Sequence, residues 1–595
     1  MSVNIKMLAA LCSVAVSLTS GCHSMRNDSD ADINGVSPMY PYGDTETAFA
    51  PEKAEAEDFR IDLSEDAVIM FADEGISFGS PYIERQGYAA VIRQGGVYRI
   101  SGTMDGGRVV VDCDDPVSLI FDGLNIQGVD RIGTAPLKIT VMSDTVNRLA
   151  GDAVGCGISS GGNITVNGSG RLDIEGVTAI RCGALKLCGG DIGISSGKDG
   201  IMSTEYVVLA GGSLNIRSGG KGVNIKNERS QGYMSIDGGK LEINSCGDGI
   251  FASDAVFVSN GSVDILSGGG SGAVLHFGRN KTYPIGKHGG FATDGSSDFD
   301  FDALVSGDGS KVESKKGIST DGFVDISGGD LVIDSADDSI SAHMDIDVSG
   351  GRLMASSGDD GIHCDNSIKI SDGNICIDDS YIALEGLSVA INGGDLTLNS
   401  YYDGINAAGG NNMISSGAAD SAEKYVSISG GKVCIKAGGD GIDSAGTAAI
   451  SGGDILVFSG NEPEFASLDY SGSFALSGGT LAAFGSDVLT KAPSIVSNSC
   501  ISVLADVKKG GLLTIKDESD SIIFETVMAS DCSSVIFSYS DITVGRVYNI
   551  FADGICVNSV MASEGVCGDG PSGRETGVFD DVLSSGQGNT GELIA

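Results

Sequence analysis

The sequence has no tryptophan, only 10 prolines in 595 residues, and few basic side chains, with 37 Lys and Arg against 80 Asp and Glu. The formal net charge of −43 argues against a nucleic-acid partner, because phosphate binding requires a basic surface. Such a charge suits divalent cations, and it is also a common device for solubility. Glycine is abundant, at 91 residues, and 41% of the chain is hydrophobic, which argues against disorder.

The cysteines lack the closely paired spacings of a zinc site or a disulfide framework, and we interpret those after Cys22 as small packing groups. Lys6 followed by the apolar residues 7–18 predicts an export signal that is too short to span a membrane. Residues 18–22, Leu-Thr-Ser-Gly-Cys, resemble the lipobox of bacterial lipoproteins, although Leu18 lies one place further from the cysteine than usual. The resemblance implies lipidation at Cys22 and an exported lipoprotein anchored at the bacterial cell surface. Ordinary secretion is the alternative.

A repeat of about 22 residues dominates the chain from about residue 155. A small residue followed by an apolar one recurs from Gly157-Ile158 to Gly441-Ile442, and the longer intervals predict loops. The longest, between Gly272-Ala273 and Gly317-Ile318, is either a loop or a hidden coil. A second element keeps the same period: a glycine pair, or Asn-Gly or Asp-Gly, followed by an apolar-x-apolar triplet.

Period-two alternation makes these triplets short strands with one face inward, and the glycine pairs supply the positive φ of sharp turns. A single repeat cannot bury its apolar face, whereas stacking at about 4.8 Å per coil buries all of them in one core. The leucine-rich-repeat pattern is absent, and a propeller blade needs about 40 residues. We therefore predict an all-β fold, a right-handed parallel β-helix with a small C-terminal β cap. The expected regions are a signal peptide ending at the lipidated cysteine (1–22), a flexible tether (23–58), an N-terminal β region or first coils (59–154), β-helix repeats (155–480), the cap (481–567) and a disordered tail (568–595).

Several coils carry sequence that resembles a known family. The segments are Asp-Asp-Ser-Ile at 337–340, Gly-Asp-Asp-Gly-Ile-His at 358–363 and Asp-Gly-Ile-Asn-Ala-Ala-Gly-Gly at 403–410. With the interleaved Gly-Gly strands, they are similar to the carbohydrate-binding β-helix surface proteins of clostridia, which are related in fold to pectate lyases. The resemblance covers about residues 59–554 and implies binding of plant cell-wall polysaccharide, especially acidic pectin, with bound calcium; it does not imply lyase activity. Where the family usually has Ser-Tyr-Glu-Gly-Ile-Glu-Gly, Ile382 replaces the first glutamate and Glu385 is kept.

The spacing of several aspartates predicts a metal site. Stacking in register brings residues at equivalent positions of successive repeats to within about 4.8 Å of one another. The position before the small–apolar pair carries Lys316, Asp338, Asp360, Ile382, Asp403 and Asp440. Four carboxylates, at Asp337, Asp338, Asp359 and Asp360, would crowd one corner, and their repulsion disfavours the fold. A calcium ion with about six to eight oxygen ligands removes that repulsion. We expect Ca²⁺ there and at a second, weaker site formed by Asp403 and Asp440; solvated turn aspartates are the alternative.

The outward position after the apolar residue predicts a polar row that includes His363, Glu385 and Asn406. Such a row can hydrogen-bond to a sugar chain running along the stack. Tyr381 and Tyr402 lie beside it and are candidates for stacking on sugar rings. An ordinary solvated face and loop packing are the alternatives, and His363 alone is more typical of a surface histidine than of a catalytic base.

We therefore expect a calcium-dependent, carbohydrate-binding surface lipoprotein that recognises acidic pectin (polygalacturonate) or another cell-wall glycan. It would contact the membrane only through its lipid anchor. A calcium-dependent polysaccharide lyase is the first alternative, because Lys315 or Lys316 lies one coil from Asp338 and could serve as the base. A structural adhesin that binds a protein partner is the second.

Overall fold

Nearly every regular element of the chain is a β-strand, and most strands run parallel to their neighbours. The structure, a computed structural model, describes residues 50–151, 155–227, 231–273, 314–408, 424–497 and 499–572. Within these ranges the only helical elements are the short α1 (Ala56–Phe59) and η2 (Ser271–Ala273), and no helix could cross a membrane. The expected signal peptide with Cys22, most of the tether and residues 573–595 lie outside the described residues.

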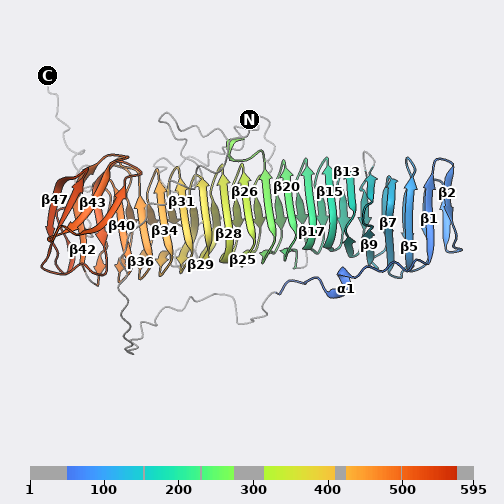
Figure 1. Cartoon of the computed structure of the whole chain (residues 1–595), viewed down its shortest axis with the longest axis horizontal. Helices are drawn as coiled ribbons and strands as arrows, with labels where there is room; N and C mark the ends of the chain where they lie inside the picture. The colour runs from blue at the N-terminus through green and yellow to red at the C-terminus, as the bar shows by residue number, and fades with distance from the viewer. Residues whose placement is uncertain are drawn as a thin grey trace, which may run out of the picture.

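The strands form one long stack in which each coil contributes to three parallel ladders (Figure 1). Each strand pairs with the strand about 22 residues further along the chain, as expected for a repeat protein. In the first ladder, Ile362 pairs with Ile340 on one side and with Leu384 on the other. Some strands bend around a corner of the coil and take part in two ladders.

The first ladder consists of β4 (Ala89–Ile92), β6 (Arg108–Asp112), β8 (Gly128–Ile132), β11 (Ile158–Ser160), β14 (Ile180–Cys182), β16 (Ile201–Ser203), β18 (Val223–Ile225), β21 (Ile250–Ala252), β24 (Ile318–Thr320), β27 (Ile340–Ala342), the starts of β29 (Ile362–Asp379) and β30 (Leu384–Ile391), β32 (Ile405–Ala407), β35 (Ile442–Ser444) and β38 (Leu468–Tyr470). The second consists of β1 (Ala67–Ala72), β5 (Gly96–Thr103), β7 (Val117–Ile126), β9 (Leu137–Val141), β12 (Ile164–Gly168), β15 (Leu185–Ser196), β17 (Tyr206–Ser218), β19 (Tyr233–Ile236), β22 (Ala255–Val258), β25 (Phe323–Ile326), β28 (Asp345–Ser357), parts of β29 and β30, β33 (Tyr425–Ile428), β36 (Thr447–Ile450), β39 (Phe474–Leu476) and β41 (Ile495–Val496). The third consists of the later parts of β5, β7, β15, β17, β28 and β29 together with β10 (Val146–Ala150), β13 (Arg171–Gly176), β20 (Lys240–Ser245), β23 (Ser262–Ser267), β26 (Asp330–Ser335), β31 (Asp395–Ser400), β34 (Lys432–Ala437), β37 (Asp454–Phe458) and β40 (Thr480–Gly485).

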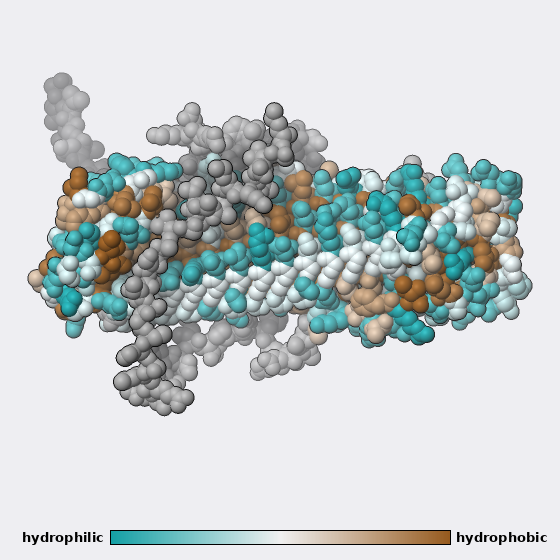
Figure 2. Space-filling model, viewed as in Figure 1, coloured by the Kyte–Doolittle hydropathy of each residue, from teal (hydrophilic) through white to brown (hydrophobic). Residues whose placement is uncertain are grey.

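The inward face of the first ladder is a row of aliphatic side chains. Ile340, Ile362 and Ile405 lie in this row and each is 0% exposed, which confirms the predicted stacking. They belong to a single hydrophobic core that continues through the stack. Because burial of one aliphatic side chain stabilises the fold by about 1.5–3 kcal/mol, stability accumulates coil by coil. On the face shown in Figure 2, hydrophilic and neutral residues form regular rows along the stack.

Glycines have two separate roles in the coils. Gly351 ends a glycine pair at the turn from the second to the third ladder and has a φ of 84°, which confirms the predicted positive φ. Gly361 is the small residue of a small–apolar pair, and there a Cβ would lie 2.7 Å from the carbonyl oxygen of Ala383 and from the side chain of Ile377. Larger residues at this position would therefore push neighbouring coils apart.

The ladders correct the expected repeat count in two places. Ile250 pairs directly with Ile318, so no coil intervenes between these two strands of the first ladder. The expectation of a coil at Gly272-Ala273 is wrong, because this pair lies in η2, just after three consecutive glycines with positive φ at 268–270. A further rung follows the last expected one, since Ile442 pairs with Leu468.

The two ends of the stack differ in architecture. Parallel pairing begins with β1 and β5, where the hairpin strands β2 (Gly75–Phe78) and β3 (Ile83–Gln86) join antiparallel to β1 and β4. At the other end β40 pairs antiparallel with β45, and a separate antiparallel sheet shares a second hydrophobic core with this end of the stack. The strands of this C-terminal region are β42 (Ser499–Val507), β43 (Leu512–Asp517), β44 (Ile522–Val527), β45 (Cys532–Ser538), β46 (Val547–Ala552), β47 (Ile555–Met561) and β48 (Gly565–Cys567).

Residues 50–58, which the sequence analysis assigns to the flexible tether, lie against the outside of the second ladder. The backbone N–H of Glu52 donates to the Tyr233 hydroxyl at 2.8 Å, and the Asn167 amide donates to the carbonyl oxygen of Asp58 at 2.8 Å. Since these two contacts lie several coils apart, this segment follows the long axis of the stack.

We predict that Ile362→Asp prevents folding, because it places an unpaired charge in the core. Val146→Asp is the matched control, since Val146 is 64% exposed and pairs with Arg171 on the neighbouring strand. Soluble yield and thermal melting measure both effects. Wild-type melting of soluble Ile362→Asp would contradict the buried ladder.

Candidate functional site

The corner between the third and first ladders carries the polar residues predicted to bind metal. The residue before each small–apolar pair forms a row along the stack, here called the corner row. From the coil of β16 onward it reads Asp199, Lys221, Asp248, Lys316, Asp338, Asp360, Ile382, Asp403, Asp440 and Ala466. Backbone hydrogen bonds fix its register, for example from Gly361 N–H to the carbonyl oxygen of Ile382 at 2.8 Å. The register expected from the sequence is confirmed.

Each aspartate of the corner row makes a structural hydrogen bond. Its Oδ1 accepts a hydrogen bond from the backbone N–H of the corner-row residue on the next coil. These bonds join Lys221 to Asp199 (3.0 Å), Lys316 to Asp248 (3.0 Å), Asp360 to Asp338 (3.2 Å), Ile382 to Asp360 (3.2 Å), Asp440 to Asp403 (2.8 Å) and Ala466 to Asp440 (2.6 Å). Aspartate therefore recurs here because its short side chain reaches the backbone of the next coil.

Lysines compensate the first half of the corner row. Lys221 forms an ion pair with Asp248, and Lys316 forms one with Asp338 and lies 3.5 Å from Asp337. Burial opposes the charge on Lys316, yet attraction to Asp338 and Asp337 raises its pKa overall. A lysine held in its protonated form does not fit the role of a lyase base.

The four aspartates expected to form one metal site do not form a single group: three lie together, and the fourth has a different partner. Asp337, Asp338 and Asp359 have carboxylate oxygens within 4.8 Å of one another. Burial, followed by repulsion from Asp338 and Asp337, raises the pKa of Asp359 to about 8. Asp360, by contrast, directs its Oδ2 to His363.

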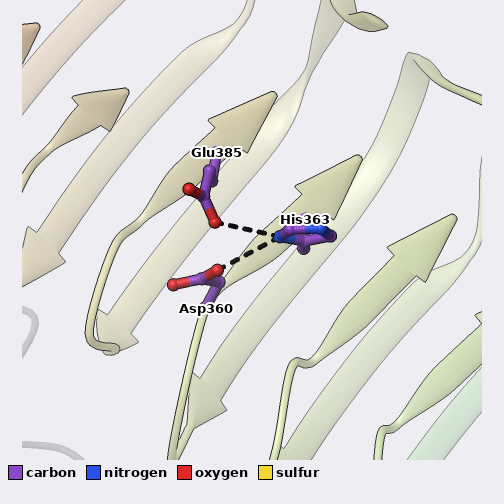
Figure 3. A group of neighbouring side chains, drawn as sticks. All are labelled: Asp360, His363 and Glu385. Atoms are coloured by element: carbon purple, nitrogen blue, oxygen red, sulfur yellow. Dashed lines mark hydrogen bonds and ion pairs between the residues drawn. The ribbon is translucent and has the colours of Figure 1, made fainter. Parts of the chain in front are cut away.

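His363 lies at the centre of a carboxylate cluster (Figure 3). Its Nδ1 is 3.2 Å from Oδ2 of Asp360 and 3.0 Å from Oε2 of Glu385, and its Nε2 is 3.3 Å from Oδ1 of Asp365. Burial opposes protonation, but the hydrogen bonds to Asp360, Asp365 and Glu385 raise the pKa of His363 and favour the imidazolium. Only 12% of the side chain is exposed, so the expectation of a surface histidine is wrong. The cause is register, because Glu385 is the in-register partner of His363 on the next strand.

A second acidic group lies further along the same corner. Oxygens of Asp440, Asp443 and Asp469 lie within 4.8 Å of one another. Burial, with repulsion from Asp443 and Asp469, raises the pKa of Asp440 to about 7, and burial with repulsion from Asp469 raises that of Asp443 to about 6. Asp403 is 3% exposed, and burial with repulsion from Asp440 raises its pKa well above the usual value. Lys491 pairs with Asp469 at 2.8 Å, but among the described residues no Lys or Arg forms an ion pair with Asp403 or Asp440.

The predicted sugar-contact residues lie close together but are only partly accessible. Glu385 is 1% exposed and Asn406 is 8% exposed, so neither offers a surface for direct contact with a sugar. Tyr381 and Tyr402 stack on each other with ring centroids 5.3 Å apart, and Tyr402 meets the edge of Phe465 at 5.9 Å. Both tyrosines are half-buried, and this packing corresponds to the alternative of loop packing.

Sequence reasoning missed two acidic members of these clusters. Asp365 follows His363 by two residues on β29, and this period-two spacing could have shown that both side chains lie on the same face. Asp469 pairs with Asp443 on the rung beyond the last expected one. The irregular interval before β38 concealed this rung.

We predict that Asp403→Ala lowers the free energy of unfolding by about 1–3 kcal/mol relative to Asp403→Asn, because alanine leaves the N–H of Asp440 without its acceptor. Asparagine retains an oxygen there and removes a buried charge. Chemical denaturation of both variants in a chelating buffer measures the difference. Equal stability would show that the side-chain hydrogen bond does not contribute to stacking.

Comparison with known proteins identifies the family. A family model described as carbohydrate-binding domain-containing protein matches residues 86–361 and 359–528. No curated protein matches the chain. A solved structure described as the polysaccharide lyase-like protein from C. thermocellum, gadolinium derivative, is 24% identical with a TM-score of 0.30, over 34% of this chain and 92% of that chain. Because the family model spans more than half of the sequence, the chain belongs to the family of carbohydrate-binding domain-containing proteins.

Proposed function

We propose that the protein is a calcium-dependent carbohydrate-binding protein that recognises an acidic polysaccharide such as polygalacturonate. Membership of a carbohydrate-binding family supports the general function. The observation that carries the specific proposal is the pair of oxygen-rich groups in one corner of the stack, formed by Asp337, Asp338 and Asp359 and by Asp440, Asp443 and Asp469.

Charge makes a bridging cation necessary for this ligand. A protein with a net charge of −43 repels a polyanion, so binding requires local positive charge. Ca²⁺ prefers carboxylate oxygens and accepts ligands from several sources at once. An ion held by the corner carboxylates could share its remaining positions with a sugar carboxylate, which would convert repulsion into attraction.

The second group fits a calcium ion better than the first. Lys316 forms ion pairs with two aspartates of the first group, Asp337 and Asp338, whereas in the second group Lys491 pairs with Asp469 alone. In addition, Oδ1 of Asp440 accepts the N–H of Ala466, which fixes the position of the carboxylate. We therefore place the stronger calcium site at Asp440, Asp443 and Asp469, with Asp403 adjacent.

The proposal extends to the form of the stack and its location. Connections between parallel strands of one sheet are right-handed in nearly all proteins, which supports a right-handed parallel β-helix. A lipid on Cys22 would anchor this β-helix to the bacterial surface. The row of repeated coils would then lie along a polysaccharide chain. Such a match is favourable because both the protein and the polysaccharide consist of regularly repeated units.

We predict that calcium-loaded protein is retained on immobilised polygalacturonate and that chelation abolishes retention. Asp440→Asn combined with Asp443→Asn should weaken retention at least about tenfold, because it removes two of the negative charges that attract calcium. Asparagine keeps the oxygen that accepts the Ala466 N–H, so the fold should persist. A pull-down with calcium and then with chelator measures both effects.

The matched control combines Asp347→Asn with Asp372→Asn, which removes the same two charges from exposed positions on β28 and β29. This control should bind as the wild type does. Equal retention of wild type and the corner variant with and without calcium would contradict the proposal. Release of unsaturated, ultraviolet-absorbing products would instead indicate a lyase.

A further inference from the structure

One group of potential metal ligands differs chemically from the two acidic groups, because it contains an imidazole nitrogen. Of the three groups within the described residues, only that of Asp360, His363 and Glu385 has a histidine. We propose that these three residues form a binding site for a divalent first-row transition ion of the Zn²⁺ class. The proposal concerns a separate site and does not depend on the calcium-bridged binding of polysaccharide.

The distances in this group match those of a small ion with nitrogen and oxygen ligands. Nδ1 of His363 lies 3.2 Å from Oδ2 of Asp360 and 3.0 Å from Oε2 of Glu385 (Figure 3). For metal–ligand bonds of about 2.1 Å, neighbouring ligand atoms lie about 3.0–3.4 Å apart. An ion can therefore replace the proton on Nδ1 with only a small movement of the three side chains.

The surroundings orient the ligands as they do in known metal sites. Oδ1 of Asp365 lies 3.3 Å from Nε2 of His363, the ring nitrogen that faces away from the proposed ion. A carboxylate on the second nitrogen fixes the tautomer and the ring orientation of metal-binding histidines. Asp360 is fixed independently, because its Oδ1 accepts the N–H of Ile382 at 3.2 Å.

A buried oxygen next to the group gives a second, independent indication of a ligand. Asn406 is the in-register partner of Glu385, so its side chain lies on the same side of the ladder. It is 8% exposed, and its Oδ1 has no hydrogen-bond partner among the described residues. Buried polar atoms rarely remain unpaired. A water molecule on the proposed ion would supply the missing donor.

The ligand types select against calcium at this position. Ca²⁺ takes about six to eight oxygen ligands, and this group offers a central nitrogen. Imidazole with carboxylates suits Zn²⁺ and its first-row neighbours. The corner would thus bind two classes of ion, with the transition ion at the coils of β29 and β30 and calcium further along the stack.

The test uses Co²⁺ as a visible-absorption probe of the Zn²⁺-class site in the full chain, after chelation and in excess calcium. We expect a single equivalent of Co²⁺ to bind, to be displaced by Zn²⁺ and to resist calcium. His363→Gln and Glu385→Gln should each abolish this binding, and Asp365→Asn should weaken it about 10- to 100-fold. Asp347→Asn is the matched control and should leave Co²⁺ binding unchanged, since Asp347 lies at an exposed position on β28.

X-ray absorption of the wild-type cobalt complex keeps the proposal testable if a variant fails to fold. A spectrum with one imidazole ligand is expected, and a spectrum without imidazole would overturn the proposal. Unchanged Co²⁺ absorption in folded His363→Gln would also overturn it. Polygalacturonate retention with calcium, measured on Glu385→Gln, should equal that of the wild type. If the wild-type protein is not retained on polygalacturonate with calcium, this result would contradict the proposed function and not the transition-ion site.

Discussion

Parallel coils of about 22 residues stack in register, so each side chain meets its counterpart on the next coil at about 4.8 Å. Inside the stack this contact between like residues is favourable, and Ile340, Ile362 and Ile405 lie in one buried aliphatic row. At the corner the same register brings like charges together, which is unfavourable unless a counter-charge intervenes. Both the stability of the core and the chemistry of the corner follow from this single constraint.

The chain resolves the repulsion differently along the corner row. In the early coils lysines alternate with aspartates, and the ion pairs of Lys221 and Lys316 neutralise the row. In the middle coils, His363 contacts three carboxylates, those of Asp360, Glu385 and Asp365. In the later coils, Asp403 and Asp440 have raised pKa values and no ion pair with a described lysine or arginine. The compensation of the corner row by lysines therefore decreases along the stack.

The repeat itself could be predicted from the sequence because strand alternation and turn glycines are local features. The positive φ at Gly351 and the pairing of Ile362 followed directly from the spacing. Irregular intervals were less informative, since a small–apolar pair such as Gly272-Ala273 also occurs in a loop. The accessibility of the polar row was also not predictable, and Glu385 and Asn406 proved to be buried.

The sequence by itself determined which residues share a corner, because a fixed period converts sequence distance into spatial contact. It identified Asp337, Asp338, Asp359 and Asp360 as neighbours. Only the tertiary structure decided how these carboxylates are divided, with Asp360 bound to His363 and the others beside Lys316. The reason is that spacing fixes the positions of backbone atoms, whereas the partner of each carboxylate oxygen depends on side-chain conformation and on burial by residues distant in the chain.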